Sequence, residues 1–471
     1  MMATSSAPKA GGAGARLALA LGRPVDAASL AAFRVVFGAL LLLTTLRYFA
    51  HGWIAEYFLI PRHFFKYWGF EWVRPWPGPG MYVHFGLMAL CAVGVTLGYR
   101  YRASVAGYGL LFAYAHLIDK TNYLNHYYLV MCVCWLLAWL PLASEWSLDA
   151  RRAVDARRPR VPAWMLWALR AQFGLVYFFG GVAKLNADWL LRAQPLSLWL
   201  ARSSDAPWVG GLLAAPATAV LMSCAGLVFD LTVVPGELWR RSRPFAFGAL
   251  VLFHTVTSRL FAIGMFPYFM IAGATLFFEP DWPRRLLAGL GWRAPLQPSR
   301  VGDAPTGGGR WSLLGFGAYF ALQLLLPLRH WLYPGELCWS EQGFRFSWNV
   351  MLMEKNGSVD FRVVEPSSGR SFQVSPRDYF TPYQTAMMSS QPDMLLEAAR
   401  IVATDYRTRG LDAPAVYADA FASLNGRPMQ RLVDPRVDLA REVDGLANKS
   451  WILPLNAQPE SRVASLLRSP R

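Results

Sequence analysis

A single lysine ends the apolar, glycine-containing run FGLVYFFGGVAKLNADWL, residues 173–190. Apolar surroundings favour the neutral form of an amine, so Lys184 could act as a base toward a weakly acidic hydroxyl group. The adjacent Gly180 and Gly181 would let a flat ligand approach the backbone. The alternative is that Lys184 extends its ammonium into the lipid headgroup region, and residue physics alone favours this alternative.

Two histidines have a similar choice of roles. His126, in DKTNYLNHYYL, is flanked by tyrosines and suits either an interfacial hydrogen bond or catalysis. His254, in FGALVLFHTVTSRLFAIGMF, falls well inside an apolar run, where imidazoles are rare and have a functional or packing partner. We find no CxxC pair and no other ligand cluster that would hold a metal.

The composition indicates which elements must position these side chains. Of the 471 residues, 54% are hydrophobic, 14% aromatic and only 16% charged, which is too apolar for a soluble chain. The net charge of +16 comes mostly from short basic runs between apolar segments. Such runs are typical of membrane topology signals, so we do not expect a nucleic-acid partner.

Hydropathy predicts a mainly α-helical, polytopic bundle of about nine transmembrane helices within a membrane domain, residues 28–332. Residues 1–27 are expected to form a disordered tail. Basic residues concentrate in alternate loops, which predicts a cytoplasmic N-terminus and places Lys120, His126, Lys184 and Arg259 near the opposite face. The expected spans are 28–50, 81–98, 103–119, 124–142, 162–183, 211–234, 244–260, 262–279 and 311–329.

The last third of the chain has a different pattern. A linker is expected at about 293–309, followed after the last span by an extracytoplasmic α+β domain, residues 333–455, and a polar tail, residues 456–471. Within the domain, alternating apolar residues around NGS and SSG predict hairpin strands. DMLLEAARIVATDYRTRG predicts a helix capped by Gly410, and AVYADAFASLN predicts a short strand.

Several motifs, in order, resemble the vitamin K-dependent gamma-carboxylases, integral membrane enzymes with bacterial relatives. The resemblance extends over about residues 30–440. The motifs are LIDKTNYLNHYYL (117–129), VYFFGGVAKLNADWL (176–190), FHTVTSRLFAIGMFPYFM (253–270), EPDWPRRL (279–286), LYPGE (332–336), FSWNVML (346–352) and RLVDPRVDL (431–439).

The resemblance implies a role for several residues. Lys184 matches the base that deprotonates vitamin K hydroquinone, and His126 matches a catalytic histidine with Asn125 beside it. His254 and the TSRLFAIGMF stretch that contains Arg259 match a segment expected near the cofactor. The expected cofactor contacts are Asn125, His254, Arg259, Gly180 and Gly181, and Trp348 and Met351 fall in a stretch similar to the glutamate-binding region.

The resemblance also implies the reaction. Oxygenation of the hydroquinone gives an alkoxide that removes the glutamyl γ proton, carbon dioxide adds to give gamma-carboxyglutamate, and the cofactor leaves as vitamin K epoxide, with no metal. The implied partners are a lipid bilayer, a glutamate-containing peptide or protein, and a quinone-reducing partner. Ala183 stands where animal members usually have a second lysine. Two alternatives stay open: a quinol epoxidase or oxygenase without peptide carboxylation, and a non-enzymatic membrane lipid- or quinone-binding protein.

Overall fold

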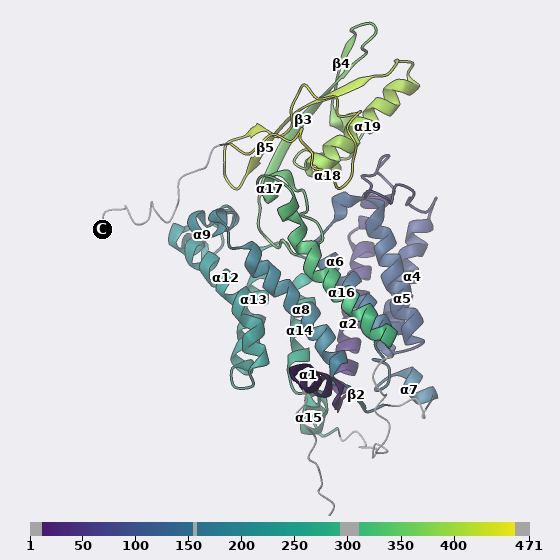
Figure 1. The fold of residues 1–471 in the computed structure, drawn as a ribbon, viewed down its shortest axis with the longest axis vertical. Helices are drawn as coiled ribbons and strands as arrows, with labels where there is room; N and C mark the ends of the chain where they lie inside the picture. Colours follow the sequence, from purple (N-terminus) through teal and green to yellow (C-terminus); the bar gives the residue numbers. More distant parts are fainter. Residues whose placement is uncertain (1–11, 154–157, 293–309, 457–471) are drawn as a thin grey trace, which may run out of the picture.

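The computed structural model describes residues 12–153, 158–292 and 310–456. A helical bundle forms one end of the elongated molecule, and a small domain with a sheet forms the other end (Figure 1). The expected linker at 293–309 and all but the first residue of the expected polar tail lie outside the described residues.

Long apolar helices make up the bundle. The first group packs in sequence order, α2 against α4, α4 against α5 and α5 against α6, and α8 then packs against α12 and α12 against α13. The bounds are α2 (Ala28–Ala50), α4 (Gly80–Leu97), α5 (Tyr101–Ile118), α6 (Asn125–Trp139), α8 (Ala163–Ala183), α12 (Pro216–Leu238), α13 (Arg243–Leu260), α14 (Phe266–Ala274) and α16 (Arg310–Leu328).

Four of these helices, α2, α4, α8 and α12, are long and apolar enough to cross a membrane. At about 1.5 Å per residue, the 23 residues of α2 extend about 35 Å, which exceeds the hydrocarbon core of a bilayer. Large apolar side chains such as Leu90, Leu221 and Phe245 are exposed on the bundle, as lipid-facing residues are. A helix lies at each of the nine expected positions, but nine crossings remain a prediction, because α6 and α14 are short.

Short elements connect the long helices. They cover both ends of the bundle, and α1, α7 and α15 lie at the end opposite the sheet (Figure 1). Their bounds are α1 (Ala13–Gly22), α3 (Trp53–Phe58), η1 (Lys120–Asn122), α7 (Leu148–Arg152), α9 (Ala187–Arg192), α10 (Leu196–Ala201), α11 (Gly210–Ala214), η3 (Thr275–Phe277), α15 (Trp282–Gly289) and η4 (Arg329–Leu332).

The N-terminal region differs from the expected disordered tail. Residues 1–11 lie outside the described residues, but α1 follows directly, and β1 (Pro24–Asp26) pairs antiparallel with β2 (Arg160–Pro162). The Ala/Leu-rich sequence AGARLALALG has high intrinsic helix propensity, which the polar, small-residue character of the flanking segment obscures.

The C-terminal domain is the expected α+β unit. Its sheet has the order β4-β3-β5-β6, and α19 packs against β5. The strands are β3 (Lys355–Val364), β4 (Ser371–Val374), β5 (Ala415–Leu424) and β6 (Gln430–Arg431), and the helical elements are α17 (Leu337–Ser340), η5 (Pro376–Asp378), α18 (Pro382–Met388) and α19 (Pro392–Thr408).

One turn prediction in this domain is wrong. The SSG signal does lie in the β3–β4 connection, but NGS lies inside β3, where Gly357 pairs with Ala422. A Cβ added to Gly357 would lie 2.3 Å from the carbonyl oxygen of Ser389. The glycine is therefore explained by a close approach of the Ser389 backbone, which passes beside the strand, and not by a turn.

Candidate functional site

Lys184 is buried at the C-terminal end of α8, and only 5% of the residue is exposed. Its Nζ donates to Asp230 Oδ2 of α12 at 2.8 Å and to the carbonyl oxygen of Gly180 at 3.1 Å. The Trp189 ring centroid lies 5.1 Å from the same nitrogen. Lys184 therefore does not extend into the headgroup region, and its charge is compensated inside the protein.

An apolar cavity of about 80 Å³ adjoins Lys184. Its walls come mainly from α8, α12, α13 and α14, with contributions from α9, α10 and residues 350–351, and they include Val176, Phe253, Phe266 and Met270. Polar side chains also line it, namely those of Lys184, Asp230, Tyr177, Thr257 and His254. An apolar enclosure with a few convergent polar groups is typical of a small-molecule site.

His254 is paired with Tyr177 at the wall of this cavity. Its Nε2 lies 2.7 Å from the Tyr177 hydroxyl, and the residue is 1% exposed. The other ring nitrogen, Nδ1, is buried and has no hydrogen-bond partner among the described residues. A buried polar atom without a partner carries a desolvation cost, so a ligand that hydrogen-bonds it would remove that cost.

Residues 341–351, which we call the connecting segment, bring the C-terminal domain to the cavity. Val350 and Met351 line the cavity, and Lys184 Nζ lies 3.5 Å from the Val350 carbonyl oxygen. Four non-glycine residues of this segment have positive φ: Glu341 (55°), Phe346 (61°), Trp348 (56°) and Met351 (56°). Such conformations are uncommon for bulky residues and cluster at functional sites.

Asn125 holds the connecting segment and does not line the cavity. Its Nδ2 donates to the carbonyl oxygen of Asn349 at 2.9 Å, and its Oδ1 accepts from the Tyr123 hydroxyl at 2.9 Å. The same hydroxyl accepts from the Phe346 backbone N–H at 2.7 Å. Asn125 therefore holds the backbone beside Val350 in place, and its own side chain is not in reach of a ligand in the cavity.

His126 lies one layer behind the cavity. Its ring centroid is 6.1 Å from that of Phe266, a cavity residue, and 4.5 Å from that of Tyr127. Gly264 packs close by, since a Cβ added there would lie 3.6 Å from His126 Nε2. The structure therefore brings His126 next to the wall but not into contact with Lys184.

Three other expected site residues lie outside the cavity lining. Arg259 is exposed on α13, and Trp348 is fully buried against Tyr128, with ring centroids 4.8 Å apart. Gly181 packs on α12, where an added Cβ would lie 2.6 Å from Leu231 Cδ2. Its small size therefore serves helix packing rather than ligand approach, while Gly180 does line the cavity.

Three polar residues of the cavity, Asp230, Tyr177 and Thr257, are not among the site residues predicted from the sequence. Asp230 had a detectable signal, since a carboxylate inside the apolar run 216–238 is rare and functional by default. Tyr177 had none, because tyrosine is ordinary in an apolar run. Among the described residues, no group of three or more His, Cys, Asp or Glu side chains is placed to hold a metal ion.

Comparison with protein families assigns both parts of the chain. Residues 22–282, which include Lys184 and most of the cavity, match the family model of the HTTM domain, so the bundle is of the HTTM class. Residues 309–458 match the lumenal domain of vitamin K-dependent gamma-carboxylase. The chain therefore belongs to the vitamin K-dependent gamma-carboxylase family. No solved structure matches it.

Proposed function

We propose that this protein is a vitamin K-dependent gamma-glutamyl carboxylase whose base is Lys184. The proposal rests on one observation: residues from both parts of the chain line the same apolar cavity. Lys184 belongs to the HTTM-type bundle, and Val350 and Met351 belong to the carboxylase-type domain. An amine that faces both a hydrophobic enclosure and the carboxylase-type domain suits a reaction between a lipophilic cofactor and a glutamyl residue.

The chemistry of the cavity suits a reduced quinone. Aromatic and methionine side chains would contact a flat ring, and Lys184 and His254 Nδ1 would meet its hydroxyl groups. At about 80 Å³ the cavity is smaller than the roughly 300 Å³ of typical ligand pockets, so binding requires side chains to move. Met222, Met270 and Met351 line it, and unbranched methionines rearrange readily.

Asp230 gives Lys184 a suitable end state for proton uptake. The ion pair in the structure, with Lys184 Nζ 2.8 Å from the Asp230 carboxylate, then corresponds to the state after proton uptake, and the amine must release this proton before it can accept one from a phenol. The proton transfer then ends on a compensated ion pair instead of an isolated charge, which an apolar site would strongly disfavour.

Reduced vitamin K bound at this site would, together with oxygen, supply the strong base that is needed to remove a glutamyl γ proton. The protein's own contribution is to place the reactants and to exclude water, because no side-chain base can remove so weakly acidic a proton. The buried aromatic wall and the connecting segment serve that exclusion. Carbon dioxide is the second co-substrate of the proposed reaction, and a quinone reductase is the expected partner that restores the reduced cofactor.

A second function is favoured by one observation. Trp348, expected in the glutamate region, is buried away from the cavity, which fits a quinol epoxidase that does not carboxylate peptides. The third candidate is a quinone-binding protein without catalysis. The purified protein should be given reduced vitamin K, oxygen, carbon-labelled bicarbonate and a short glutamyl peptide. Epoxide together with labelled peptide supports the carboxylase, epoxide alone supports the epoxidase, and neither product supports the third candidate.

We further propose that the C-terminal domain faces away from the cytoplasm. The basic loops around α7, α15 and the α12–α13 turn lie at the bundle end opposite the sheet (Figure 1), as expected if that end is cytoplasmic. Reporter fusions placed after residue 340 should be active only on the extracytoplasmic side. A cytoplasmic signal from these fusions would show that the C-terminal domain has the opposite orientation.

A further inference from the structure

A second cavity, of about 190 Å³, lies where the bundle meets the C-terminal domain. In contrast to the Lys184 cavity, its walls are rich in charged side chains. Lys120 comes from η1, Arg329 from η4, Arg345 from the connecting segment, Asp393 from α19, and Lys449 from the loop near the C-terminus. The partly exposed Trp68 also lines it.

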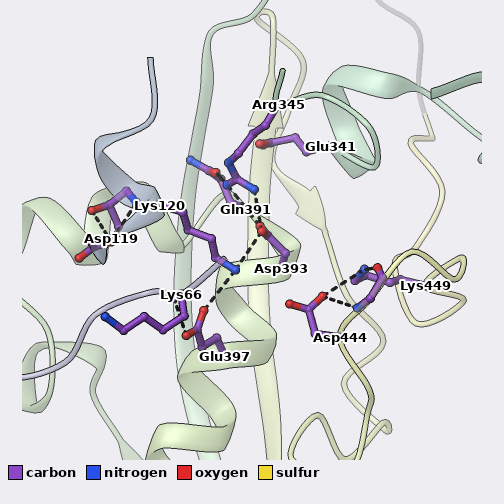
Figure 2. Close-up of polar contacts among 12 residues, drawn as sticks. Lys66, Asp119, Lys120, Glu341, Arg345, Gln391, Asp393, Glu397, Asp444 and Lys449 are labelled. Carbon is purple, nitrogen blue, oxygen red and sulfur yellow. Dashed lines mark hydrogen bonds and ion pairs between the residues drawn. The ribbon is translucent and has the colours of Figure 1, made fainter. Parts of the chain in front are cut away.

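Most of these charges are already paired, as Figure 2 shows. Lys120 Nζ lies 3.1 Å from Asp393 and 3.2 Å from Glu397, and Arg345 Nη1 lies 2.7 Å from Asp393. Lys449 lies 3.4 Å from Asp444. These pairs tie the connecting segment and α19 to the bundle.

Arg329 is the exception. It forms no ion pair with any residue in the described ranges, and its hydrogen bond goes to the carbonyl oxygen of Arg345. The lining therefore has four cationic side chains (Lys120, Arg329, Arg345 and Lys449) against three carboxylates (Glu341, Asp393 and Asp444). Counting the adjacent Lys355 and Glu397, which pair with Glu341 and Lys120, leaves the surplus at one positive charge when Glu397 is ionised, and protonation of Glu397 increases it.

This surplus selects the class of ligand. A planar guanidinium matches a carboxylate through two parallel hydrogen bonds, and one monoanion would neutralise the cavity. A doubly charged phosphate would leave excess negative charge beside Asp393, Asp444 and Glu341. The site therefore favours a carboxylate.

The connecting segment places this cavity close to Lys184. Phe346 lines the charged cavity and Val350 lines the Lys184 cavity, so the two walls are four residues apart. Their Cα atoms are separated by at most about 14 Å, the fully extended length of four residues. A peptide of several residues is long enough to reach both cavities.

We propose that the Arg329 cavity binds a second carboxylate of the same polypeptide whose glutamyl residue enters the Lys184 site. This inference rests on the proposed function for the identity of the ligand. It makes the enzyme selective for acidic sequences in which a second Glu lies a few residues from the Glu that is modified.

The test is a binding measurement on the full-length chain in nanodiscs without vitamin K. Two fluorescently labelled peptides are compared by anisotropy: one has two Glu residues four positions apart, and the other has the second Glu replaced by Gln. The two-Glu peptide should bind roughly tenfold more tightly, the effect of one charged hydrogen-bonded pair. Equal affinity for the two peptides would overturn the proposal.

Variants assign the preference to this cavity. Arg329→Gln should abolish it, and Arg329→Lys should retain part of it. The matched control is Arg409→Gln, which should leave the preference unchanged, because Arg409 follows α19 directly and pairs with Asp405 on the exposed surface. Lys449→Gln also removes the surplus charge, so it should weaken the preference even if Arg329→Gln does not fold. A preference that survives in both Arg329→Gln and Lys449→Gln contradicts the assignment.

The same peptides separate this inference from the proposed function. If the wild-type protein prefers the two-Glu peptide but produces no labelled product from either, the carboxylase proposal fails and the carboxylate site stands. If it carboxylates both peptides and binds them equally, the carboxylase stands and the second site fails.

Discussion

The ion pair of Lys184 and Asp230 is the centre of the proposed site at the residue scale. Both side chains are largely buried, and their atoms lie 2.8 Å apart on neighbouring helices. Removing one partner of a buried pair typically costs about 3–5 kcal/mol, because the other charge is left uncompensated. Activity and stability effects at these positions must therefore be measured together.

Lys184→Ala should abolish epoxide formation, because no other amine lines the cavity within the described residues. We expect a loss of at least roughly 10²-fold, and partial rescue by a small exogenous amine that enters the vacated space. Arg259→Ala is the control, since Arg259 is exposed and lies outside the lining. Full activity of Lys184→Ala would remove this residue from its role.

His126→Ala should lower turnover by roughly 10²-fold while leaving membrane insertion intact. The physical reason is indirect, since His126 supports Gly264 and Phe266 at the cavity wall. Epoxide formation and insertion should be assayed on the same membranes. A variant that fails to insert would indicate that the histidine is structural.

Four of the residues singled out in the sequence line the cavity. They are Lys184, Gly180, His254 and Met351, each of an unusual type for its run or within a family motif, and their roles stay predictions. Arg259 was expected near the cofactor but is exposed outside the cavity lining. The sequence places it near the end of a helix, which does not define the direction in which its side chain points. The pairing of Lys184 with Asp230 depends on the packing of two helices, which periodicity alone does not reveal.

At the element scale, the contact of α8 with α12 sets the geometry of the ion pair. Gly181→Val would push against Leu231 and Asp230 and move α12 away from α8. Overpacking of this kind costs about 1–3 kcal/mol, so both thermal stability in detergent and epoxide formation should fall.

Gly174→Ala is the matched control on the same helix. A Cβ there would lie 3.5 Å from Val234 Cγ1, an ordinary contact, so stability should be unchanged or slightly higher. If Gly181→Val is as stable and active as Gly174→Ala, the close α8–α12 contact does not control the site.

Hydropathy located the long helices well, because a lipid-facing helix must be apolar over its whole length. Short-range signals were less reliable. NGS resembles a turn signal, but a glycine is required at position 357 because the backbone of Ser389, 32 residues away along the chain, passes too close for a Cβ atom. Such close approaches arise from tertiary packing and leave no local signature.

At the scale of the whole molecule, function requires the C-terminal domain to stay docked on the bundle. Gln384 of α18 bonds to Asp119 at 2.8 Å, and the Lys120, Asp393 and Glu397 group lies beside it (Figure 2). Burial opposes the ionisation of Asp393, but Arg345 and Lys120 outweigh it and hold its pKa low. This docking keeps Val350 and Met351 at the Lys184 cavity.

The docking should depend on pH through Glu397. Burial, only partly offset by Lys120, raises the pKa of this carboxyl from 4.5 to about 7. The folded state then binds the proton more tightly than the unfolded state, so the contribution of Glu397 to stability falls as pH rises from about 4.5 to 7. Asp393 stays ionised throughout this window.

Melting temperatures between pH 5 and 8 would measure this effect. Glu397→Gln, which resembles the protonated form, should flatten the decrease seen in the wild-type protein. Identical pH dependence in the two proteins would show that Glu397 does not titrate in this range.

The most direct test of the central claim is transfer of labelled carbon dioxide to a glutamyl peptide by the purified protein with reduced vitamin K and oxygen. The wild-type protein should place label in the γ-carboxyl group of the peptide, and Lys184→Ala in the same lipid should place none. Two results would contradict the proposed carboxylase function. One is a folded wild-type protein that forms epoxide but leaves the peptide unlabelled, and the other is equal labelling of the peptide by Lys184→Ala.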